Sequence, residues 1–184
     1  MWDGIKTPRL LLREFTLADV DGYYKLESNE ENARYQDWAP RTKDEAQLLV
    51  LANMESSSAD SRNVWELVVE HEGEMIGRVG AAVTRVDADE SAKTFTRYNF
   101  WYSFLPSVQG KGLATEAMTA FIDTLVAARG TEGMELEIEC DPRNTGSRKL
   151  AERLGFKKHS LTENAWESKG EWVDSLVYRK AVPT

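Results

Sequence analysis

The sequence has one cysteine, Cys140, in 184 residues, and two histidines, His71 and His159. A single thiol cannot close a disulfide within the chain, which agrees with a reducing, cytoplasmic compartment. The two histidines lie far apart and do not show the spacing of metal ligands. We therefore expect no metal site. We also expect Cys140, which has no histidine near it in sequence, to be a small buried side chain rather than a nucleophile.

Long apolar segments, internal repeats and low-complexity linkers are also absent. No stretch approaches the length of a membrane span, and no charged segment followed by an apolar one precedes the first predicted strand. A chain of this length suits one domain with a substantial core. We expect a single domain over residues 1–184 in the cytoplasm, without a membrane partner. Monomer and homodimer are both open at this point.

Basic residues are in the minority, because 23 Lys and Arg stand against 31 Asp and Glu, and the net charge is −8. Non-specific nucleic-acid binding needs a basic surface, so we expect no nucleic-acid partner. An acidic protein could steer a cationic substrate towards itself. The same charge is also typical of the solvated surface of any acidic protein, and the charge alone does not separate these two interpretations.

A glycine-rich turn is the most informative feature that the sequence does contain. Residues 98–105 are aromatic-rich and favour a buried strand. Residues 109–115 follow, with Gly110 and Gly112 ahead of an amphipathic helix. The first turn of a helix has unpartnered N–H groups and a partial positive charge, and glycine lets an anion approach them. The turn therefore predicts a diphosphate site, although an ordinary strand-to-helix connection shows the same pattern.

A second motif lies about thirty residues further along the chain. Residues 134–140 alternate between apolar and charged side chains, which predicts a half-buried strand. After a polar turn, Leu150 and Leu154 lie four residues apart on one face of a helix, and Gly155 favours its end. The aromatic-rich strand, the helix after the glycine turn and the strand at 134–140 make a βαβ crossover, which favours parallel pairing of the two strands.

Hydrophobic patterning and turn residues predict the other elements. Residues 9–15 read as an edge strand, and helices are expected from Leu17 and from Lys43 to 56–58. A hairpin is expected from strands at 65–70 and 75–84, and residues 87–92 read as a mobile loop. The last two strands, 156–161 and 171–180, are expected to pair antiparallel through a loop that contains Trp166 and Gly170.

The motifs together resemble the GNAT superfamily of acyl-CoA-dependent N-acyltransferases. The resemblance rests on Gln109-x-x-Gly112-x-Ala114, Asn144-x-x-Ser147 and the run from Leu154 to Phe156. Residues 7–15, with Ala18-Asp19 after them, resemble the branch of the ribosomal-protein N-terminal acetyltransferases. The resemblance covers residues 7–181, and its motifs occur in the expected order.

The resemblance implies an α/β (α+β) fold and a reaction. The fold is a mixed, mostly antiparallel twisted sheet of about seven strands, with helices on both faces and one parallel strand pair at the cofactor site. The reaction is direct transfer of an acetyl group from acetyl-CoA, without a metal, to a primary amine of a small molecule or a peptide N-terminus. A nucleotide-binding domain is a weaker alternative, because the turn lacks the Gly-Lys-Ser/Thr of a P-loop.

The resemblance also assigns residues to the donor. The backbone of Phe104 and Leu105 would lie against the pantetheine arm, and Asn144 would reach that arm. The diphosphate would be held by Gln109, Gly110, Lys111, Gly112, Leu113, Ala114 and Thr115. Lys111 could add its charge to this site, or it could be an exposed lysine at a helix start.

Proton transfer is where the sequence departs from the family pattern. Many members carry a tyrosine where this chain has Ala151, whereas the ribosomal-protein branch resembles a scheme with a serine at the position of Ser147. Ser147 is therefore expected to be the general acid, although a serine at a helix start is also a common cap. The branch's carboxylate base aligns with Asn99, which cannot accept a proton at neutral pH. Either another carboxylate acts, or the amine arrives deprotonated, or the protein is a weak or inactive acyl-CoA-binding sensor.

The acceptor pocket is expected between the first two helices, by the same resemblance. Tyr35, Asp37 and Trp38 lie in that segment, and Tyr102 would add a wall. Asp37 could pair with a cationic amine, or it could be an exposed loop carboxylate.

Overall fold

The computed structural model describes residues 4–59, 62–86, 95–129 and 133–182. The loop predicted at 87–92 lies outside these residues. Eight strands within the described ranges form one sheet, in the order β1-β2-β3-β4-β5-β6-β8-β7. Their bounds are β1 Ile5–Lys6, β2 Leu11–Arg13, β3 Val64–His71, β4 Glu74–Val86, β5 Phe95–Phe104, β6 Met134–Cys140, β7 Lys157–Ser168 and β8 Glu171–Ala181.

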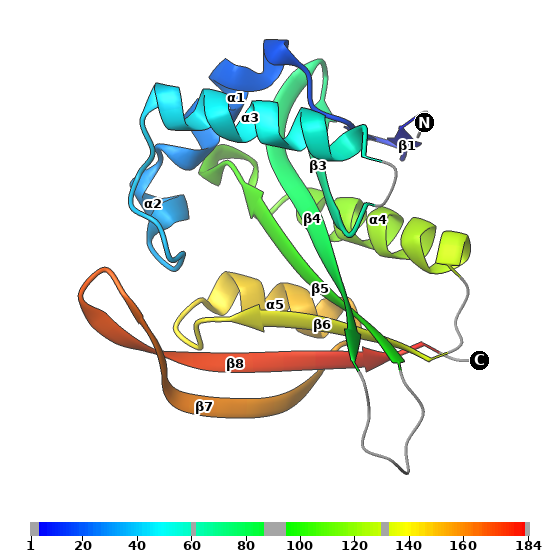
Figure 1. The fold of residues 1–184 in the computed structure, drawn as a ribbon, viewed down its shortest axis with the longest axis vertical. Coiled ribbons are helices and arrows are strands. Elements are labelled where there is room, and N and C mark those ends of the chain that lie inside the picture. Colours follow the sequence, from blue (N-terminus) through cyan, green and yellow to red (C-terminus); the bar gives the residue numbers. More distant parts are fainter. Residues whose placement is uncertain (1–3, 60–61, 87–94, 130–132, 183–184) are drawn as a thin grey trace.

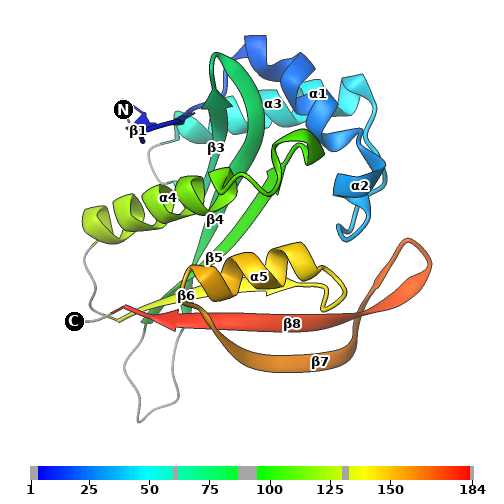
Figure 2. The same ribbon diagram turned by 180° about the vertical axis from the view of Figure 1, so that it is seen from behind.

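The helices lie on both faces of this sheet (Figure 1 and Figure 2). They are α1 Val20–Glu27, α2 Glu30–Ala33, α3 Lys43–Ser57, α4 Leu113–Arg129 and α5 Thr145–Arg153, with 3-10 turns at Leu17–Asp19 and Pro106–Val108. Among the described strands, β5 and β6 pair in parallel and the other neighbours pair antiparallel. The predicted fold class is therefore confirmed, with eight strands instead of about seven because Ile5–Lys6 adds β1. Since β1 pairs outside β2, the prediction of an edge strand at residues 9–15 was wrong.

The parallel pairing predicted for the βαβ crossover is confirmed between β5 and β6, and β8 lies between β6 and β7. Strand β8 buries Leu176 and Tyr178 in the core, whereas β7 is exposed along almost its whole length. The apolar strand therefore takes the inner position and the polar strand takes the edge. Trp166, which was predicted to lie in a loop, belongs to β7, and the turn is confined to Lys169 and Gly170.

The side chains of β5 alternate between the two faces of the sheet, and each face has its own layer of helices. Tyr98 and Phe100 point into the main core, where Phe100 meets Phe121 of α4 edge-on at 6.0 Å between ring centroids. Asn99 and Trp101 point to the opposite face, because successive strand residues alternate. On that face α1 and α3 close a second, smaller core over β3 and β4. The end of β5 therefore lies between the two layers of helices.

A buried ion-pair network fixes α1 to the sheet through Glu27. The Arg78 guanidinium of β4 lies 3.1 Å from Glu27 of α1 and 2.9 Å from Glu66 of β3, and all three residues are buried. Trp101 donates a hydrogen bond to Glu66 from its indole nitrogen at 2.9 Å. Because a buried charge is costly without partners, this network holds α1, and with it α2, above the end of β5. Of the helices described, none is both long and apolar enough to cross a membrane.

Candidate active site

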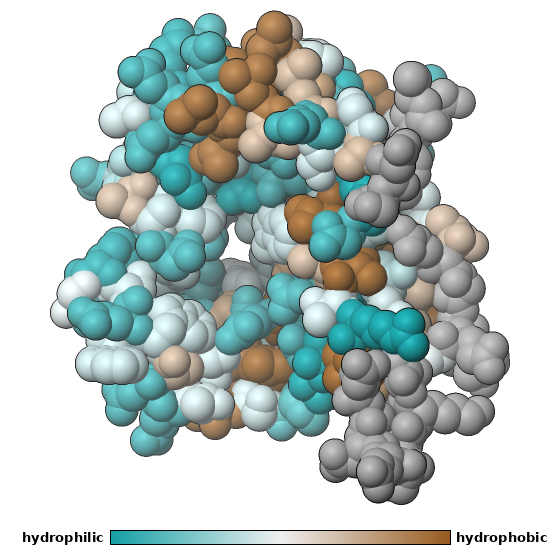
Figure 3. Space-filling model, viewed as in Figure 1, coloured by the Kyte–Doolittle hydropathy of each residue, from teal (hydrophilic) through white to brown (hydrophobic). Residues whose placement is uncertain are grey.

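The sheet opens between β5 and β6. Their parallel pairing ends at Phe100 with Ile138, but β5 continues to Phe104 against β4 alone. The backbone of residues 101–104 therefore lacks a strand partner on its β6 side. A cavity of about 450 Å³ lies here, lined by residues 102–104 of β5. The hollow is visible on the surface between the upper and lower parts of the molecule (Figure 3).

The glycine-rich turn forms one wall of this cavity. Gly110 and Gly112 have φ values of +75° and +77°, a region that L side chains rarely adopt. The first intrahelical hydrogen bond of α4 runs from the N–H of Glu116 to the carbonyl of Gly112, at 3.0 Å. The three preceding N–H groups, of residues 113–115, therefore have no partner within the helix. These three residues line the cavity together with Gly110 and Gly112, so the predicted anion site has the required geometry.

The N-terminal segment is hydrogen-bonded to this turn and to the first turn of α4. The Glu116 carboxylate accepts hydrogen bonds from the Thr7 hydroxyl at 2.6 Å and from the Arg9 backbone N–H at 3.0 Å. It also accepts one from Arg9 Nε at 2.6 Å, and Arg9 Nη1 donates to the Lys111 carbonyl at 3.0 Å. Burial alone would raise the pKa of Glu116, but the hydrogen bonds from Thr7 and Arg9 outweigh it and lower that pKa. Residues about a hundred positions apart thus fix the start of α4.

Replacing Glu116 by glutamine should lower the free energy of unfolding by about 1 kcal/mol at pH 7, because hydrogen bonds to a charged acceptor are lost. The pKa of Glu116 is depressed in the folded state, so its stabilisation exists above the unfolded pKa and is lost as pH falls through the folded value. The difference between Glu116→Gln and the parent should therefore shrink below about pH 4. Urea unfolding at several pH values measures it.

Glu55→Gln is the matched control, since Glu55 is an exposed helical glutamate whose side chain forms no hydrogen bond within the part of the chain described. It should change stability little at any pH. A Glu116→Gln deficit that persists unchanged at pH 3 would show that the carboxylate charge is not the cause.

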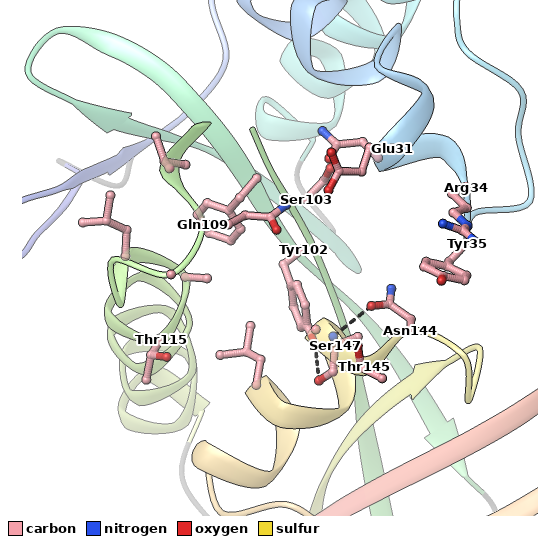
Figure 4. A pocket seen from close by; sticks show the side chains of 18 of the residues that line it. Glu31, Arg34, Tyr35, Tyr102, Ser103, Gln109, Thr115, Asn144, Thr145 and Ser147 are labelled. Atoms are coloured by element: carbon pink, nitrogen blue, oxygen red, sulfur yellow. Dashed lines mark hydrogen bonds between the residues drawn. The ribbon is translucent and has the colours of Figure 1, made fainter. Parts of the chain in front are cut away.

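A hydroxyl pair forms the opposite wall (Figure 4). Asn144 caps α5 by accepting the Ser147 N–H at 3.0 Å, which leaves the Asn144 amide NH₂ free of this bond. The Ser147 hydroxyl lies 2.7 Å from the Tyr102 hydroxyl, and Tyr102 also reaches the Ser147 carbonyl at 3.1 Å. Burial raises the pKa of Tyr102, although the hydrogen bond with Ser147 opposes the shift. The phenol therefore stays protonated at neutral pH and can support a proton donor at Ser147.

The cap of α5 is Asn144, so Ser147 is not the N-cap. Cys140 has a raised pKa, because burial outweighs its hydrogen bond with Ser147, and this agrees with the expectation that it is not a nucleophile. Ala151 is fully buried in the core beneath the site. Asn99 lies on the opposite face of β5 from the hydroxyl pair, where its amide NH₂ donates to Glu137 at 3.3 Å.

The cavity takes in most of the residues predicted for the site and leaves out five, of which Asn99 is one. Phe104, Gln109, Asn144, Ser147, Tyr35 and Tyr102 line it, with the glycine turn. Leu105 lies outside because its N–H donates to the Ile76 carbonyl at 2.9 Å, and Lys111 is exposed beyond the turn. Asp37 is exposed and Trp38 packs beneath Arg41, 5.0 Å from ring to guanidinium carbon; neither lines the cavity. The roles of all these residues stay predictions.

Several lining residues were not predicted. Glu31, Arg34 and Gln36 come from α2 and the segment after it, which is too short to give a periodic signal. Arg153 ends α5 and donates to the Thr115 hydroxyl at 3.3 Å, so it places a positive charge beside the turn. A basic residue in the last turn of a helix was the available signal for Arg153, and it is common for structural reasons alone.

The tip of the β7–β8 hairpin is joined to the segment at the end of α2 and after it, part of which lines the cavity. The Lys169 ammonium donates to the carbonyls of Ala33 at 2.7 Å and Arg34 at 3.0 Å. The Ser168 hydroxyl donates to the carbonyl of Gln36 at 3.3 Å. Two segments more than 130 residues apart in sequence therefore join over one end of the site.

A split parallel strand pair, with a glycine-rich helix start on one side and a hydroxyl pair on the other, defines an acyltransferase of the acyl-CoA type. Residues 9–157 match the acetyltransferase (GNAT) domain family, and the chain belongs to this family. It is therefore an acyltransferase.

Individual relatives are similar over nearly the whole chain. The uncharacterized N-acetyltransferase p20 of Bacillus licheniformis is 27% identical over 177 residues, covering 96% of this chain and 94% of p20. An acetyltransferase of Salmonella typhimurium that modifies the N-terminal serine of ribosomal protein L7/L12 superposes with a TM-score of 0.80 at 19% identity, covering 97% and 99%. The acetyltransferase MccE, in complex with acetyl-CoA and AMP, gives 0.78 at 18%, covering 96% and 94%.

Proposed function

We propose that this protein transfers an acetyl group from acetyl-CoA to a primary amine, either of a small molecule or at a peptide N-terminus. The observation that carries the proposal is one cavity that joins three features: free N–H groups at the start of α4, unpaired backbone at the end of β5, and the Ser147–Tyr102 hydroxyl pair.

The residues present fit the donor. Nothing lies within 4 Å of the position where a Cβ would stand on Gly110, so a diphosphate can approach the backbone there. Arg9 and Arg153 lie beside the turn and add positive charge. The unpaired backbone of residues 101–104 can pair with the amide groups of a pantetheine arm as a strand would. The Asn144 NH₂ group can donate to the same arm.

The chemistry of thioester aminolysis sets the tasks of the other residues. Unpaired N–H groups at the end of β5 can polarise the thioester carbonyl, as in an oxyanion hole. The leaving thiolate needs a proton, which the Ser147 hydroxyl can donate while Tyr102 resupplies it across 2.7 Å. Acetyl-CoA supplies the activated acyl group, and this chain orients it and handles the protons.

The acceptor class has support from two sides. The Salmonella relative modifies an N-terminal serine, which favours a peptide N-terminus, whereas the MccE structure contains AMP, which favours a small molecule. Both acceptors would enter beneath Tyr35 and Gln36, opposite the α4 and α5 side of the cavity.

Incubation with acetyl-CoA and a panel of acceptors tests the proposal. The panel contains peptides with a free N-terminal serine, the same peptides with that amine blocked, and small primary amines. Free thiol should appear only with acceptors that carry a free amine, and mass spectrometry should locate one added acetyl group on the nitrogen. Calorimetry should show acetyl-CoA binding in every case.

Two results would contradict the proposal in different ways. If acetyl-CoA does not bind, the cavity is not the donor site. If it binds but no acceptor across the panel releases thiol, the transfer to a primary amine is wrong.

A further inference from the structure

The site has no proton acceptor at Asn99, and the structure offers a carboxylate close by. Glu137 of β6 accepts a hydrogen bond from Asn99, but it is held by Arg179 at 2.8 Å and Arg97 at 3.4 Å. Glu135 is shared between the same two arginines. Arg97 and Arg179 therefore both form ion pairs with Glu135 and Glu137.

Glu139 is the next residue on this face of β6. It lies one step past the last β5–β6 pair, at Phe100 and Ile138, so it stands where the two strands part, although it does not line the cavity itself. Residues two apart on a strand point to the same side, and Glu139 therefore shares the face of Glu137 and Asn99. This face is opposite α5, and no described helix covers it at β6 and β8 (Figure 1).

Glu139 has no cationic partner among the residues that the structure describes. It is exposed, and within the described residues it forms no ion pair. The hydroxyl of Ser175 on β8 donates to Glu139 Oε1, which fixes the carboxylate and leaves Oε2 available. Val177 is the cross-strand neighbour of Glu139 on β8 and carries no charge.

The neighbouring side chain of β5 is turned away. At the level of Glu139, β5 presents Trp101, whose indole lies across Gly80 of β4, where an added Cβ would come within 2.2 Å of the ring. Its indole nitrogen donates to Glu66, further from β6. Only a glycine at position 80 permits this close approach of the Trp101 indole. Because the indole lies over Gly80, the tryptophan does not fill the space in front of Glu139.

From this placement we infer that Glu139 receives the ammonium group of the acceptor and takes its proton. The inference rests on the proposed function and deepens it, because it makes the acceptor a cation at neutral pH. One proton of the ammonium passes to the Glu139 carboxylate. The neutral nitrogen forms the C–N bond as the C–S bond breaks, and the second proton ends on the thiolate through Ser147.

A pair of thioether ligands tests the inference without a known acceptor. S-(2-aminoethyl)-coenzyme A carries an ammonium close to the sulfur, and S-ethyl-coenzyme A is its uncharged counterpart. In calorimetry at pH 7 and low salt, the parent should bind the aminoethyl compound about fivefold more tightly, as expected for a partly exposed ion pair. Glu139→Gln should remove this preference and leave the affinity for S-ethyl-coenzyme A unchanged.

The glutamine variant keeps an oxygen that accepts the Ser175 hydroxyl, so it removes the charge and preserves the local structure. Glu74→Gln, at the exposed first residue of β4, is the matched control and should retain the preference. Equal binding of the two ligands by the parent, or a preference that survives in Glu139→Gln, overturns the assignment. Binding of neither ligand overturns the proposed function, and this inference with it.

Discussion

Replacing Ser147 by alanine should lower kcat by about 10²-fold under conditions where chemistry is rate-limiting, if Ser147 protonates the leaving thiolate. The hydroxyl lies 2.7 Å from the protonated Tyr102 phenol and borders the cavity. Without it, a poorly stabilised thiolate must leave unprotonated or find a water. The KM for acetyl-CoA should change little, because the Ser147 backbone N–H that Asn144 accepts is retained in alanine. Steady-state kinetics with the best acceptor of the panel measures both constants.

Tyr102→Phe separates the two hydroxyls. It keeps the Ser147 hydroxyl and removes only its partner, so the loss in kcat should be smaller than in Ser147→Ala. Asn99→Ala should lower turnover only modestly, since an amide cannot accept the proton at neutral pH. If Ser147→Ala turns over like the parent, the serine has no part in proton transfer, and the acid must be sought elsewhere in the cavity.

Gly112→Val should weaken acetyl-CoA binding by at least about tenfold, which corresponds to about 1.4 kcal/mol. The new side chain would stand at the mouth of the free N–H groups of residues 113–115, in a cavity where the donor's diphosphate is expected. A Cβ on Gly112 would meet only Arg9 Nη2, at 3.6 Å, which is an ordinary contact, so the protein should still fold. Calorimetric titration measures the affinity, and thermal unfolding checks the fold.

The matched control is Gly73→Val. Gly73 has a φ of +81° in the β3–β4 turn, nothing lies within 4 Å of its added Cβ, and it does not line the cavity. Both variants carry a β-branched residue in the left-handed region and should lose similar stability. Only Gly112→Val should lose affinity. Equal affinities in the two folded variants would place the diphosphate somewhere other than this turn.

Features that depend on neighbours along the chain were open to prediction. The glycine turn, the capped start of α5 and the alternation of β6 each follow from local backbone geometry and side-chain period. The helix at 43–57 was likewise predicted to within one residue of its observed end. These signals are enough to specify two walls of the cavity, the glycine turn and the start of α5, since both are helix starts.

The wall of the cavity formed by residues 31–36 depends on contacts that no local pattern contains. Segment 31–36 enters the cavity because Lys169 and Ser168, more than 130 residues later, hold its carbonyls. The side chain of Tyr102, predicted as a pocket wall, meets Ser147 because α5 packs under β5. Unlike Glu135 and Glu137, Glu139 has no arginine partner among the described residues, because the strand register places Val177 opposite it and Arg179 opposite Glu137.

The amino-acid sequence by itself determined most of the elements, the single parallel crossover and the glycine-rich turn, because periodicity, glycine and helix ends act over a few residues. Only the tertiary structure decided that β8 lies inside β7, that β5 and β6 part after Phe100, and which charges stay uncompensated at that opening. Those outcomes depend on which strand can bury more apolar surface, Leu176 and Tyr178 of β8 against the polar length of β7. The strands β7 and β8 compete for the inner position with segments distant in sequence, so the outcome is decided only when the whole chain folds.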